Sequence, residues 1–572
     1  MAEGIYDYVT QELAPNVKCG VYAPVGDYQD LLPYLIRRIL ENGTNNSFVN
    51  QINDSDVSVE QMLVDPLERA KFLEYEPHPR IPLPIDLFAP DRVNSLGFDV
   101  ADSAVVVSLE QELDAYAGQV WKACSIVNGE DQELESMKVY SPANLDEQIG
   151  DVSFATPELV LSALDSAYAA CSSWRGVIVA DRAAILRQAA TLLEDEKAKF
   201  LSLLMREGGK VISDAIAELR EAVDFLRYYA MMAEKDFSEW AKLPGPAGEE
   251  NYLCFEGRGV FVCISPWNFP LAIFLGPIAA ALVSGNTVLA KPAEQTSLIA
   301  YEAVKLMHRA GIPGNVLHLL LGHGEDLSEA LLSSERIAGV AFTGSTETAN
   351  IINRTIAARS GSIIPFIAET GGLNAMIVDS SALVDQVTDD VIASAFKSVG
   401  QRCSSLRVLF LQEEIADRQI EMIRGAMQEL RVGDNALLEV DLGPVIDQSS
   451  LDRLCEYVDQ MSSANGTKLL CKTRIANDLP RGYFFAPCLF EIESISQLER
   501  EIFGPVLHVI RYKKSDLQCI IDAINSKGYG LTFAVQSRVQ SNIDRITEEI
   551  NVGNVYVNRN QVGAVVGVQP FG

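Results

Sequence analysis

Residues 260–297 read VFVCISPWNFPLAIFLGPIAAALVSGNTVLAKPAEQTS, and this stretch decides the fold class. It contains a short apolar run rich in β-branched residues (260–264), an apolar run of helix length (271–283) and a second short run (287–290). Residues 259–290 carry no charge, but prolines and asparagines interrupt them, so a buried strand and helix are favoured over a membrane span. A strand, a helix and a strand in succession predict parallel pairing through a right-handed crossover.

The same alternation continues along the chain. We expect further helices over residues 297–310 and 346–357, and further strands over 316–320, 339–342 and 363–367. Short apolar strands that alternate with helices indicate an open, mostly parallel α/β sheet. Such a sheet binds its ligand beyond the carboxyl ends of its strands.

Polar turns follow three of these strands, at residues 265–270 (SPWNFP), 291–294 (KPAE) and 343–347 (TGSTE). We expect all three turns to line one crevice. The common G-x-G-x-x-G dinucleotide motif does not follow the first strand. The third turn, capped by Ser345, could instead present free backbone N–H groups to a pyrophosphate, although an ordinary capped helix is the alternative.

The composition is that of a strongly acidic globular protein. With 78 acidic and 46 basic residues, the net charge of -32 argues against nucleic-acid partners and against membrane surfaces or insertion. Ten cysteines without a C-x-x-C pair, and only five histidines, predict reduced thiols, a cytoplasmic protein and no metal site. The acidic N-terminus is not followed by an apolar segment, so no secretory leader is expected.

The organisation of the chain changes twice, at a proline-rich stretch and again past Gly257, where strands begin to alternate with helices. The N-terminal part contains an apolar strand candidate (18–23) and an amphipathic helix (28–42). Residues 75–100 are rich in proline and are typical of an extended connection, where we expect the first boundary. Residues 155–240 show helical apolar spacing.

Seven short motifs occur in the order found in the aldehyde dehydrogenase superfamily. They are PWNFP (266–270), KPAE (291–294), FTGST (342–346), ETGG (369–372), GQRC (400–403), EIFGP (501–505) and QPFG (569–572). Within that superfamily, the chain most resembles the L-glutamate-γ-semialdehyde (Δ1-pyrroline-5-carboxylate) dehydrogenase module of the bifunctional proline utilization A proteins. The resemblance implies an α/β aldehyde dehydrogenase fold, with a Rossmann-like parallel-sheet NAD domain and an α/β catalytic domain.

The resemblance implies that an aldehyde is oxidised through a thioester. Cys403 would be the nucleophile, because thiolate addition creates the tetrahedral centre from which hydride can leave, and its small, polar turn suits an accessible thiol. A single cysteine taken alone would more simply be buried filler. Asn268 and the backbone N–H of Cys403 would hold the oxyanion, although Asn268 could merely shape its turn. Glu369 would be the general base, with its pKa raised by partial burial.

The family also implies an NAD site. Lys291 and Glu294 would bind the adenine-side ribose, and the carboxylate of Glu294 would repel a 2′-phosphate, which favours NAD over NADP. Taken without context, Lys291 and Glu501 would be read as ordinary surface residues. The full set assigned to NAD is Ser265, Trp267, Lys291, Glu294, Gly344, Ser345, Gly371, Glu501 and Phe503.

The substrate end is implied by a smaller set. Ser404 and the backbone N–H groups of Gly563 and Ala564 would hold the substrate carboxylate, which is a reasonable anchor in so acidic a protein. Phe571 and Phe269 would pack the substrate chain. The Gly563–Ala564 turn alone would be an ordinary loop.

Residues 22–26 and 34–43 resemble the last strand and last helix of the proline dehydrogenase barrel of those bifunctional proteins. The resemblance assigns Tyr22, Arg37 and Arg38 to a vestigial proline site, and an exposed helix with an Arg37–Glu41 pair is the alternative. A β/α barrel needs about 200 residues. Only its C-terminal end is therefore expected here, and no FAD site.

The expected layout is a barrel remnant (1–65), a linker (66–150), an NAD domain (151–372) and a catalytic thiol domain (373–572). Part of an oligomerisation flap is expected near 242–256, and the chain is expected to stop short of the family's C-terminal strand. The expected function is NAD-dependent oxidation of L-glutamate γ-semialdehyde to L-glutamate, the second step of proline catabolism. The expected partners are a small aldehyde, further copies of the chain, and a proline dehydrogenase module in the parent protein. A broad-range aldehyde dehydrogenase and an inactive binding scaffold stay open as alternatives.

Overall fold

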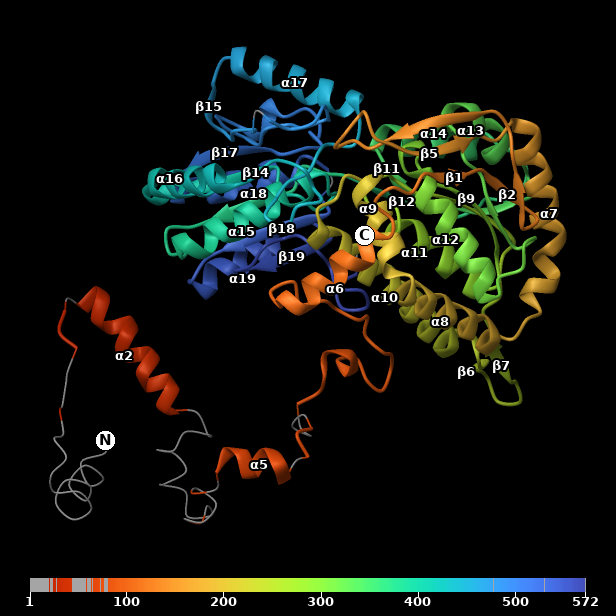
Figure 1. Cartoon of the computed structure of the whole chain (residues 1–572), viewed down its shortest axis with the longest axis horizontal. Coiled ribbons are helices and arrows are strands. Elements are labelled where there is room, and N and C mark those ends of the chain that lie inside the picture. The colour runs from red at the N-terminus through yellow and green to blue at the C-terminus, as the bar shows by residue number, and fades with distance from the viewer. Residues whose placement is uncertain are drawn as a thin grey trace. The chain divides into compact units, whose positions relative to one another are not determined.

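The computed structural model describes residues 81–570 apart from Asn477 and Tyr529, and before them residues 20, 24–26, 28–43, 58, 63, 65–72 and 74–76 (Figure 1). The chain divides into two compact units, residues 1–83 and 84–572.

The described part of the first unit contains the helices α2 (Tyr28–Gly43) and α5 (Pro66–Phe72). Helix α2 has nearly the bounds expected for the amphipathic helix. Arg37 and Arg38 are exposed on it, and the Arg38 guanidinium lies 5.4 Å from the ring centroid of Tyr34. Tyr22 and the strand expected over 18–23 lie outside the described residues.

The second unit contains two seven-stranded sheets, and residues 125–370 form the first of them. Strands β8, β9 and β10 follow one another in one direction across this sheet, whereas β11 and β12 lie on the other side of β8. These five strands run parallel, and β2 and β3 extend the β10 edge in antiparallel pairing. In spatial order the strands are β12 (Phe366–Thr370), β11 (Ile337–Gly344), β8 (Val260–Ile264), β9 (Thr287–Lys291), β10 (Leu317–Leu319), β2 (Ser125–Val127) and β3 (Glu130–Gln132).

Helices cover both faces of this sheet, and each face has its own buried apolar cluster. Helices α8, α10, α11 and α12 pack on one face, and α7, α13 and α14 on the other. Helix α11 is buried around most of its circumference, which explains why its sequence is almost entirely apolar. The helices are α7 (Pro157–Arg175), α8 (Val179–Asp195), α9 (Lys197–Arg206), α10 (Ile212–Phe237), α11 (Ala272–Val283), α12 (Ser297–Ala310), α13 (Gly324–Leu332) and α14 (Thr346–Ala357).

The second sheet forms from residues 375–557, the teal and blue part of Figure 1. All its neighbouring strands are parallel except β15 and β16. In spatial order the strands are β15 (Thr467–Lys472), β16 (Cys488–Ile492), β17 (Val506–Tyr512), β14 (Val408–Gln412), β13 (Ala375–Val378), β18 (Thr532–Gln536) and β19 (Asn554–Val557). Its helices are α15 (Val384–Phe396), α16 (Glu413–Glu429), α17 (Gln448–Ser463), α18 (Leu517–Asn525) and α19 (Gln540–Glu549).

The predicted parallel α/β organisation is confirmed, and α12 and α14 have the expected bounds. Strand β12 begins three residues later than the expected 363–367, because its pairing with β11 continues to Glu369 and Thr370. The chain then crosses to the second sheet, where β13 begins at Ala375.

Residues 84–150 pack as part of the second unit, although the sequence indicates a linker over 66–150. They contain helix α6 (Ser103–Asp114) and contribute β2 and β3 to the first sheet. They also supply most of a three-stranded sheet of β1 (Trp121–Ala123), β5 (Gln148–Ser153) and β4 (Ser136–Tyr140).

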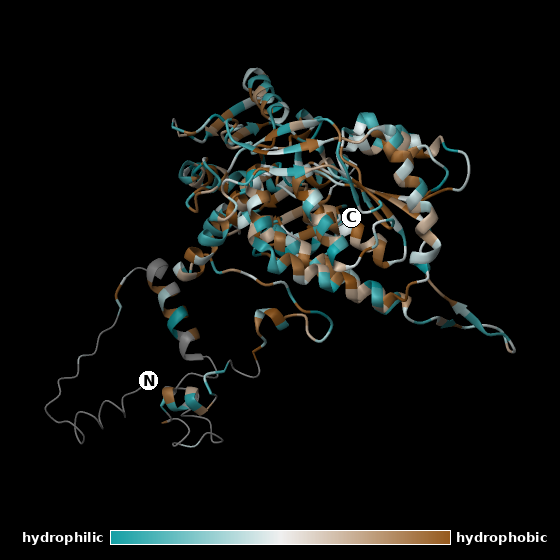
Figure 2. Cartoon of the chain, turned by 45° about the vertical axis from the view of Figure 1, so that its right-hand side comes forward, coloured by the Kyte–Doolittle hydropathy of each residue, from teal (hydrophilic) through white to brown (hydrophobic). Residues whose placement is uncertain are grey.

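A hairpin of β6 (Ala241–Leu243) and β7 (Asn251–Leu253) projects from the second unit (Figures 1 and 2). Figure 2 shows hydrophobic residues concentrated in the sheets and on the inner helices. The hairpin lies where part of an oligomerisation flap is expected. It exposes the side chains of Trp240, Leu243, Tyr252, Leu253 and Phe255. Within the described ranges, no helix is long and apolar enough to cross a membrane.

Candidate active site

A cavity of about 1490 Å³ lies at the carboxyl ends of β8 and β11, where the strand order of the first sheet reverses. Open α/β sheets bind ligands at this position. The part of the unit that forms the second sheet completes the wall with residues 402–404, 499–503, 563–564 and 566–570. The cavity exceeds a typical pocket of roughly 300–1,000 Å³ and has room for a dinucleotide beside a small substrate.

The segment before Cys403 contains one turn of left-handed backbone. Ser398, Val399 and Gly400 have φ angles of 54°, 57° and 63°. A β-branched residue such as Val399 rarely adopts this conformation, so the surrounding structure must hold it. Glycine is required at position 400, because a Cβ there would lie 2.4 Å from the carbonyl oxygen of Gly504.

Asp214 of helix α10 holds this turn. Its carboxylate accepts hydrogen bonds from Ser398 Oγ at 2.8 Å and from Arg402 Nη2 at 2.9 Å. The Arg402 Nε also donates to Ser398 Oγ, at 2.7 Å. The loop that carries the thiol is therefore fastened to a helix of the first half of the unit.

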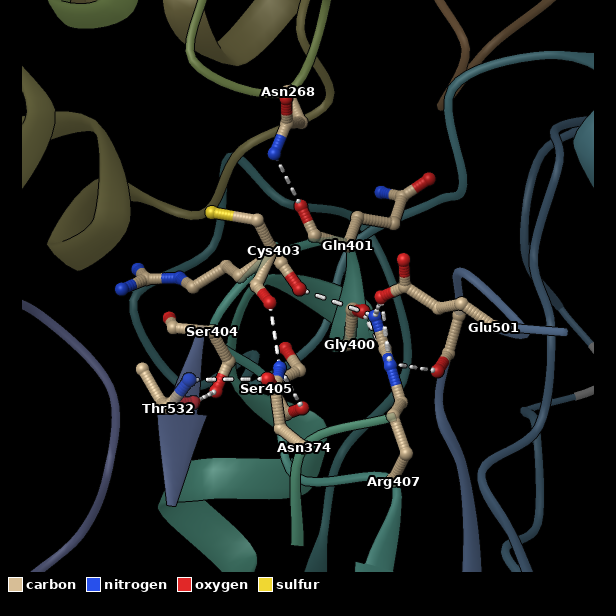
Figure 3. A network of polar contacts seen from close by, with 12 residues as sticks. Asn268, Asn374, Gly400, Gln401, Cys403, Ser404, Ser405, Arg407, Glu501 and Thr532 are labelled. Atoms are coloured by element: carbon tan, nitrogen blue, oxygen red, sulfur yellow. Dashed lines mark hydrogen bonds and ion pairs between the residues drawn. The ribbon is translucent and has the colours of Figure 1, made fainter. Parts of the chain in front are cut away.

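Arg407 and Asn374 satisfy the carbonyl oxygens of the same loop (Figure 3). The fully buried guanidinium of Arg407 donates to the carbonyl oxygens of Gly400 at 2.8 Å, Gly504 at 3.0 Å and Arg402 at 3.1 Å. The Asn374 amide donates to the carbonyl oxygens of Cys403 at 2.6 Å and Ser405 at 3.0 Å. Because these donors fix the carbonyl side of the loop, the orientation of its N–H groups is fixed as well.

Asn268 reaches the same loop from the turn after β8. Its Nδ2 donates to the carbonyl oxygen of Gln401 at 3.0 Å (Figure 3). An amide nitrogen carries two hydrogens, so a second donor remains for a ligand in the cavity. The side chain is buried and lines the cavity together with Cys403 and Glu369.

Cys403 is half-buried and lines the cavity. Burial raises the pKa of this thiol to about 12, and the carboxylates of Glu501, Glu221 and Glu369 contribute in the same direction. The thiol is therefore protonated at neutral pH. Glu369, near the end of β12, is also partly buried, and that burial raises the pKa of its carboxyl.

Glu501 and Phe503 form another part of the cavity wall. Arg407 Nη2 lies 2.8 Å from Glu501 Oε1, and the Phe503 ring packs edge-on against Trp267 with centroids 5.5 Å apart. Burial raises the pKa of Glu501, and Arg407 opposes that shift. A Cβ at Gly371 would lie 1.7 Å from Glu501 Oε2, so a larger residue there would displace the Glu501 carboxylate.

The remaining residues expected to bind NAD fall into two groups. Gly344 and Ser345 line the cavity at the start of α14, where Ser345 Oγ accepts from the Thr348 backbone N–H at 3.1 Å. Lys291 and Glu294 do not line it. Lys291 Nζ instead donates to the Pro292 carbonyl oxygen at 3.1 Å, and burial lowers the pKa of its amine.

Ser265 does not line the cavity either, and its hydroxyl contacts helix α11. Pro277 lies inside α11 and has no N–H to donate to the carbonyl oxygen of Ile273. The Ser265 hydroxyl donates to that oxygen instead, at 3.4 Å.

The expected substrate residues Phe269, Ser404, Gly563 and Ala564 all line the cavity. Gly563 has a φ of 79°, and Ser404 is buried. Phe571 lies outside the described residues.

Four residues that build this site were not predicted from the sequence: Asp214, Glu221, Asn374 and Arg407. Glu221 projects from α10 into the cavity, and burial, together with the neighbouring Glu218, raises the pKa of its carboxyl to about 7. The available signal was a row of acidic residues at helical spacing on α10, formed by Glu221 with Asp214, Glu218 and Asp224, but this row does not show which cavity the face lines. Asn374 and Arg407 bond to backbone atoms that only the folded loop brings near.

Residues 128–572 match the aldehyde dehydrogenase family profile, and residues 1–51 match that of proline dehydrogenase. The chain belongs to the aldehyde dehydrogenase family. The aldehyde dehydrogenase fold expected from the sequence is thereby confirmed, as is the likeness of the N-terminal segment to proline dehydrogenase.

Individual relatives agree with this assignment. The bifunctional protein PutA of Escherichia coli (strain K12) is 46% identical over 588 residues, which cover 100% of this chain and 44% of the relative. The 1-pyrroline-5-carboxylate dehydrogenase of Geobacillus sp. (strain WCH70) is 34% identical over 472 residues, which cover 81% of this chain and 90% of the relative. This aldehyde dehydrogenase thus spans 44% of the length of that PutA relative.

Solved structures show the same likeness. A mutant of Bradyrhizobium japonicum proline utilization A aligns with a TM-score of 0.87 at 46% identity, covering 100% of this chain and 55% of that one. A 1-pyrroline-5-carboxylate dehydrogenase aligns with a TM-score of 0.79 at 32% identity, covering 84% of this chain and 93% of that one.

Proposed function

We propose that this aldehyde dehydrogenase oxidises L-glutamate γ-semialdehyde, the open form of Δ1-pyrroline-5-carboxylate, to L-glutamate with NAD⁺. The observation that carries the proposal is that Cys403, Asn268 and Glu369 line one cavity with the Gly563–Ala564 turn. The relatives named 1-pyrroline-5-carboxylate dehydrogenase support the substrate. The reaction would be the second step of proline catabolism.

The residues around the cavity fit a dinucleotide. The first turn of α14 offers backbone N–H groups beside Gly344 and Ser345, which suits a pyrophosphate. Glu501, oriented by Arg407, would hold the nicotinamide ribose, and Phe503 would pack against it. When bound, NAD⁺ supplies the hydride acceptor and a positive charge. Lys291 and Glu294, in the turn after β9, would bind the adenine-side ribose and favour NAD⁺ over NADP⁺.

Addition of the thiol to the aldehyde begins the reaction. With a pKa of about 12, the Cys403 thiol must give its proton to a base, and we assign this role to Glu369, a cavity carboxylate whose pKa is raised by burial. The sulfur then bonds to the carbonyl carbon. The free N–H of Asn268 and the backbone N–H of Cys403 stabilise the resulting oxyanion.

Loss of hydride from the same carbon leaves a thioester on Cys403. Glu369 releases the thiol proton to solvent and then takes a proton from a water molecule, which adds to the thioester carbonyl. The carbon–sulfur bond breaks, and the thiol regains its proton. Aldehyde, NAD⁺ and water thus give the carboxylate, NADH and two protons.

The amino acid end of the substrate would meet neutral hydrogen-bond donors and one carboxylate. The Ser404 hydroxyl and the N–H groups of the Gly563–Ala564 turn would bind the α-carboxylate. The Glu221 carboxylate would bind the ammonium group. Because burial has raised the pKa of Glu221 to about 7, a nearby ammonium would favour its ionised form.

A steady-state assay of NADH absorbance tests the proposal. We expect kcat/KM for L-glutamate γ-semialdehyde to exceed that for propanal by at least roughly tenfold, since propanal lacks the charged groups. NADP⁺ should support slower turnover than NAD⁺. Equal constants for the two aldehydes would indicate a broad-range enzyme, and no turnover of either would indicate a binding scaffold.

The wider setting follows from the same family relationship. We expect a cytoplasmic homo-oligomer whose β6–β7 hairpin packs its exposed apolar side chains against another copy. The match of residues 1–51 to proline dehydrogenase supports a parent protein with that second module. Those residues are far fewer than the roughly 200 of a β/α barrel, so we expect no FAD bound by this chain.

A further inference from the structure

Residues 84–98 precede the part of the chain that matches the aldehyde dehydrogenase family, yet they are bonded to helix α10 beside the cavity. The link is Asp224, a buried carboxylate on α10. Its oxygens accept from Arg92 Nη1 at 3.0 Å, from the Ser95 backbone N–H at 3.0 Å and from Ser95 Oγ at 2.8 Å. The carboxylate is therefore paired and hydrogen-bonded, as a buried charge requires.

The same guanidinium also holds the loop at the substrate end of the cavity. Arg92 Nη2 donates to the carbonyl oxygen of Val566 at 2.6 Å, two residues beyond Ala564. The Phe88 ring centroid lies 3.8 Å from Arg92 Cζ, which fixes the plane of the guanidinium. Arg92 thus uses one nitrogen for helix α10 and another for the loop, a task that suits the rigid fork of arginine.

The loop is closely packed at this point. A Cβ at Gly567 would lie 2.9 Å from the Tyr228 ring and 3.7 Å from Arg92 Nη2. Tyr228 and Glu221 lie on the same helix and both line the cavity. Helix α10 therefore carries the proposed ammonium site and, through Asp224 and Arg92, sets the position of the proposed carboxylate site.

We propose that Arg92 is a positioning residue for the substrate end of the site. It braces the 563–567 loop against α10, so that the N–H groups of the Gly563–Ala564 turn are held at a fixed distance from Glu221. This inference rests on the proposed function, because it assigns the braced loop to an amino acid semialdehyde. A segment that joins the two modules of the parent protein would then take part in substrate selection by one of them.

The variant that tests this is Arg92→Lys in the full chain. Lysine keeps the charge beside Asp224 but has no planar fork to reach Val566 as well. The matched control is Arg227→Lys. Arg227 lies on α10, as Asp224 does, pairs with Glu194 and donates to the Asn94 carbonyl oxygen at 3.1 Å, so it also joins α10 to residues 84–98 but does not hydrogen-bond to the 563–567 loop. A second variant covers the case in which the lysine of Arg92→Lys still donates to the Val566 carbonyl oxygen. The double variant Arg92→Met with Asp224→Asn removes both charges together and leaves no donor for that oxygen.

Two measurements are made on each variant. Amide hydrogen exchange, followed by mass spectrometry over residues 563–570, should be roughly tenfold faster in Arg92→Lys and in the double variant than in wild type or Arg227→Lys. The KM for L-glutamate γ-semialdehyde should rise about tenfold in the same two variants, while the KM values for propanal and NAD⁺ change by less than about twofold.

The two measurements separate the inference from the proposed function. An unchanged rate of amide hydrogen exchange over residues 563–570 in both Arg92 variants would show that Arg92 does not hold the loop, whatever the wild-type enzyme oxidises. Faster exchange with equal losses for the semialdehyde and propanal would overturn the role in substrate selection. A wild type that does not prefer the semialdehyde would contradict the proposed function, and exchange would still report on the brace.

Discussion

At the scale of single residues, the charge state of Cys403 controls reactivity. With the pKa of its thiol raised to about 12, the thiolate fraction in the cofactor-free protein should grow about tenfold for each pH unit from about pH 7 to about pH 10. The rate of Cys403 alkylation by iodoacetamide, measured on its peptide by mass spectrometry, should follow that slope. Addition of NAD⁺ should accelerate alkylation, since a positive charge lowers the pKa of a neighbouring thiol. A plateau below about pH 9 without cofactor would show that the thiol is already ionised.

Ser404 offers a test of substrate choice. If its hydroxyl binds the α-carboxylate, Ser404→Ala loses a charge-assisted bond of about 1.5–3 kcal/mol, or roughly ten- to a hundredfold in kcat/KM for the semialdehyde. Propanal should be nearly unaffected. Ser405→Ala is the matched control, because Ser405 is adjacent and buried but does not line the cavity. Equal losses for both aldehydes in Ser404→Ala would assign the residue to general support of Cys403.

The sequence could predict the residues that touch the reacting atoms, and it could not predict the residues that hold them. Cys403, Asn268 and Glu369 stand in contiguous motifs, and the cavity brings all three together. Arg407 bonds to carbonyl oxygens five to ninety-seven residues away, and such partners have no local pattern.

At the scale of elements, the left-handed turn over residues 398–400 depends on Asp214. Asp214→Asn should lower the free energy of unfolding by about 3 kcal/mol or more, because it leaves Arg402 buried without its anion. It should also lower kcat at least about tenfold, since the turn sets the position of Cys403. Urea unfolding and steady-state kinetics measure the two effects.

The control for that variant is Glu234→Gln on the same helix. Glu234 pairs with Arg187 where both side chains are partly exposed to solvent, so its loss should cost less than about 1 kcal/mol and leave kcat unchanged. If Asp214→Asn unfolds more easily but keeps full kcat, then contacts other than Asp214 hold the turn.

Elements with a strong apolar period could be predicted well, and short or edge elements could not. Strand β8 and helices α12 and α14 were expected at their observed bounds, because each buries a whole face or both faces. Strands β2 and β3 have three residues each, too few for a period to show. Helix α13 was not expected, and the end of β12 was set by its register against β11.

At the scale of the whole molecule, a net charge of -32 opposes the approach of an anionic cofactor. Raising the ionic strength from about 0.01 M to about 0.1 M shortens the Debye length from roughly 30 Å to roughly 10 Å. The association rate of NAD⁺ with a Cys403→Ala variant, followed by stopped-flow fluorescence, should therefore rise with salt. A rate that falls with salt would show that local positive groups dominate the field at the cavity.

The central claim is that a glutamate semialdehyde becomes a thioester on Cys403 and that Glu369 directs its hydrolysis. The most direct test is to mix Glu369→Gln with L-glutamate γ-semialdehyde and NAD⁺, quench in acid within the first turnover and measure the intact mass. Solvent can accept the thiol proton in place of Glu369, so the protein should gain one γ-glutamyl group on the Cys403 peptide, together with a burst of one NADH per site. The Cys403→Ala variant should show neither. A burst of NADH without the adduct, or an adduct on another residue, would contradict the account.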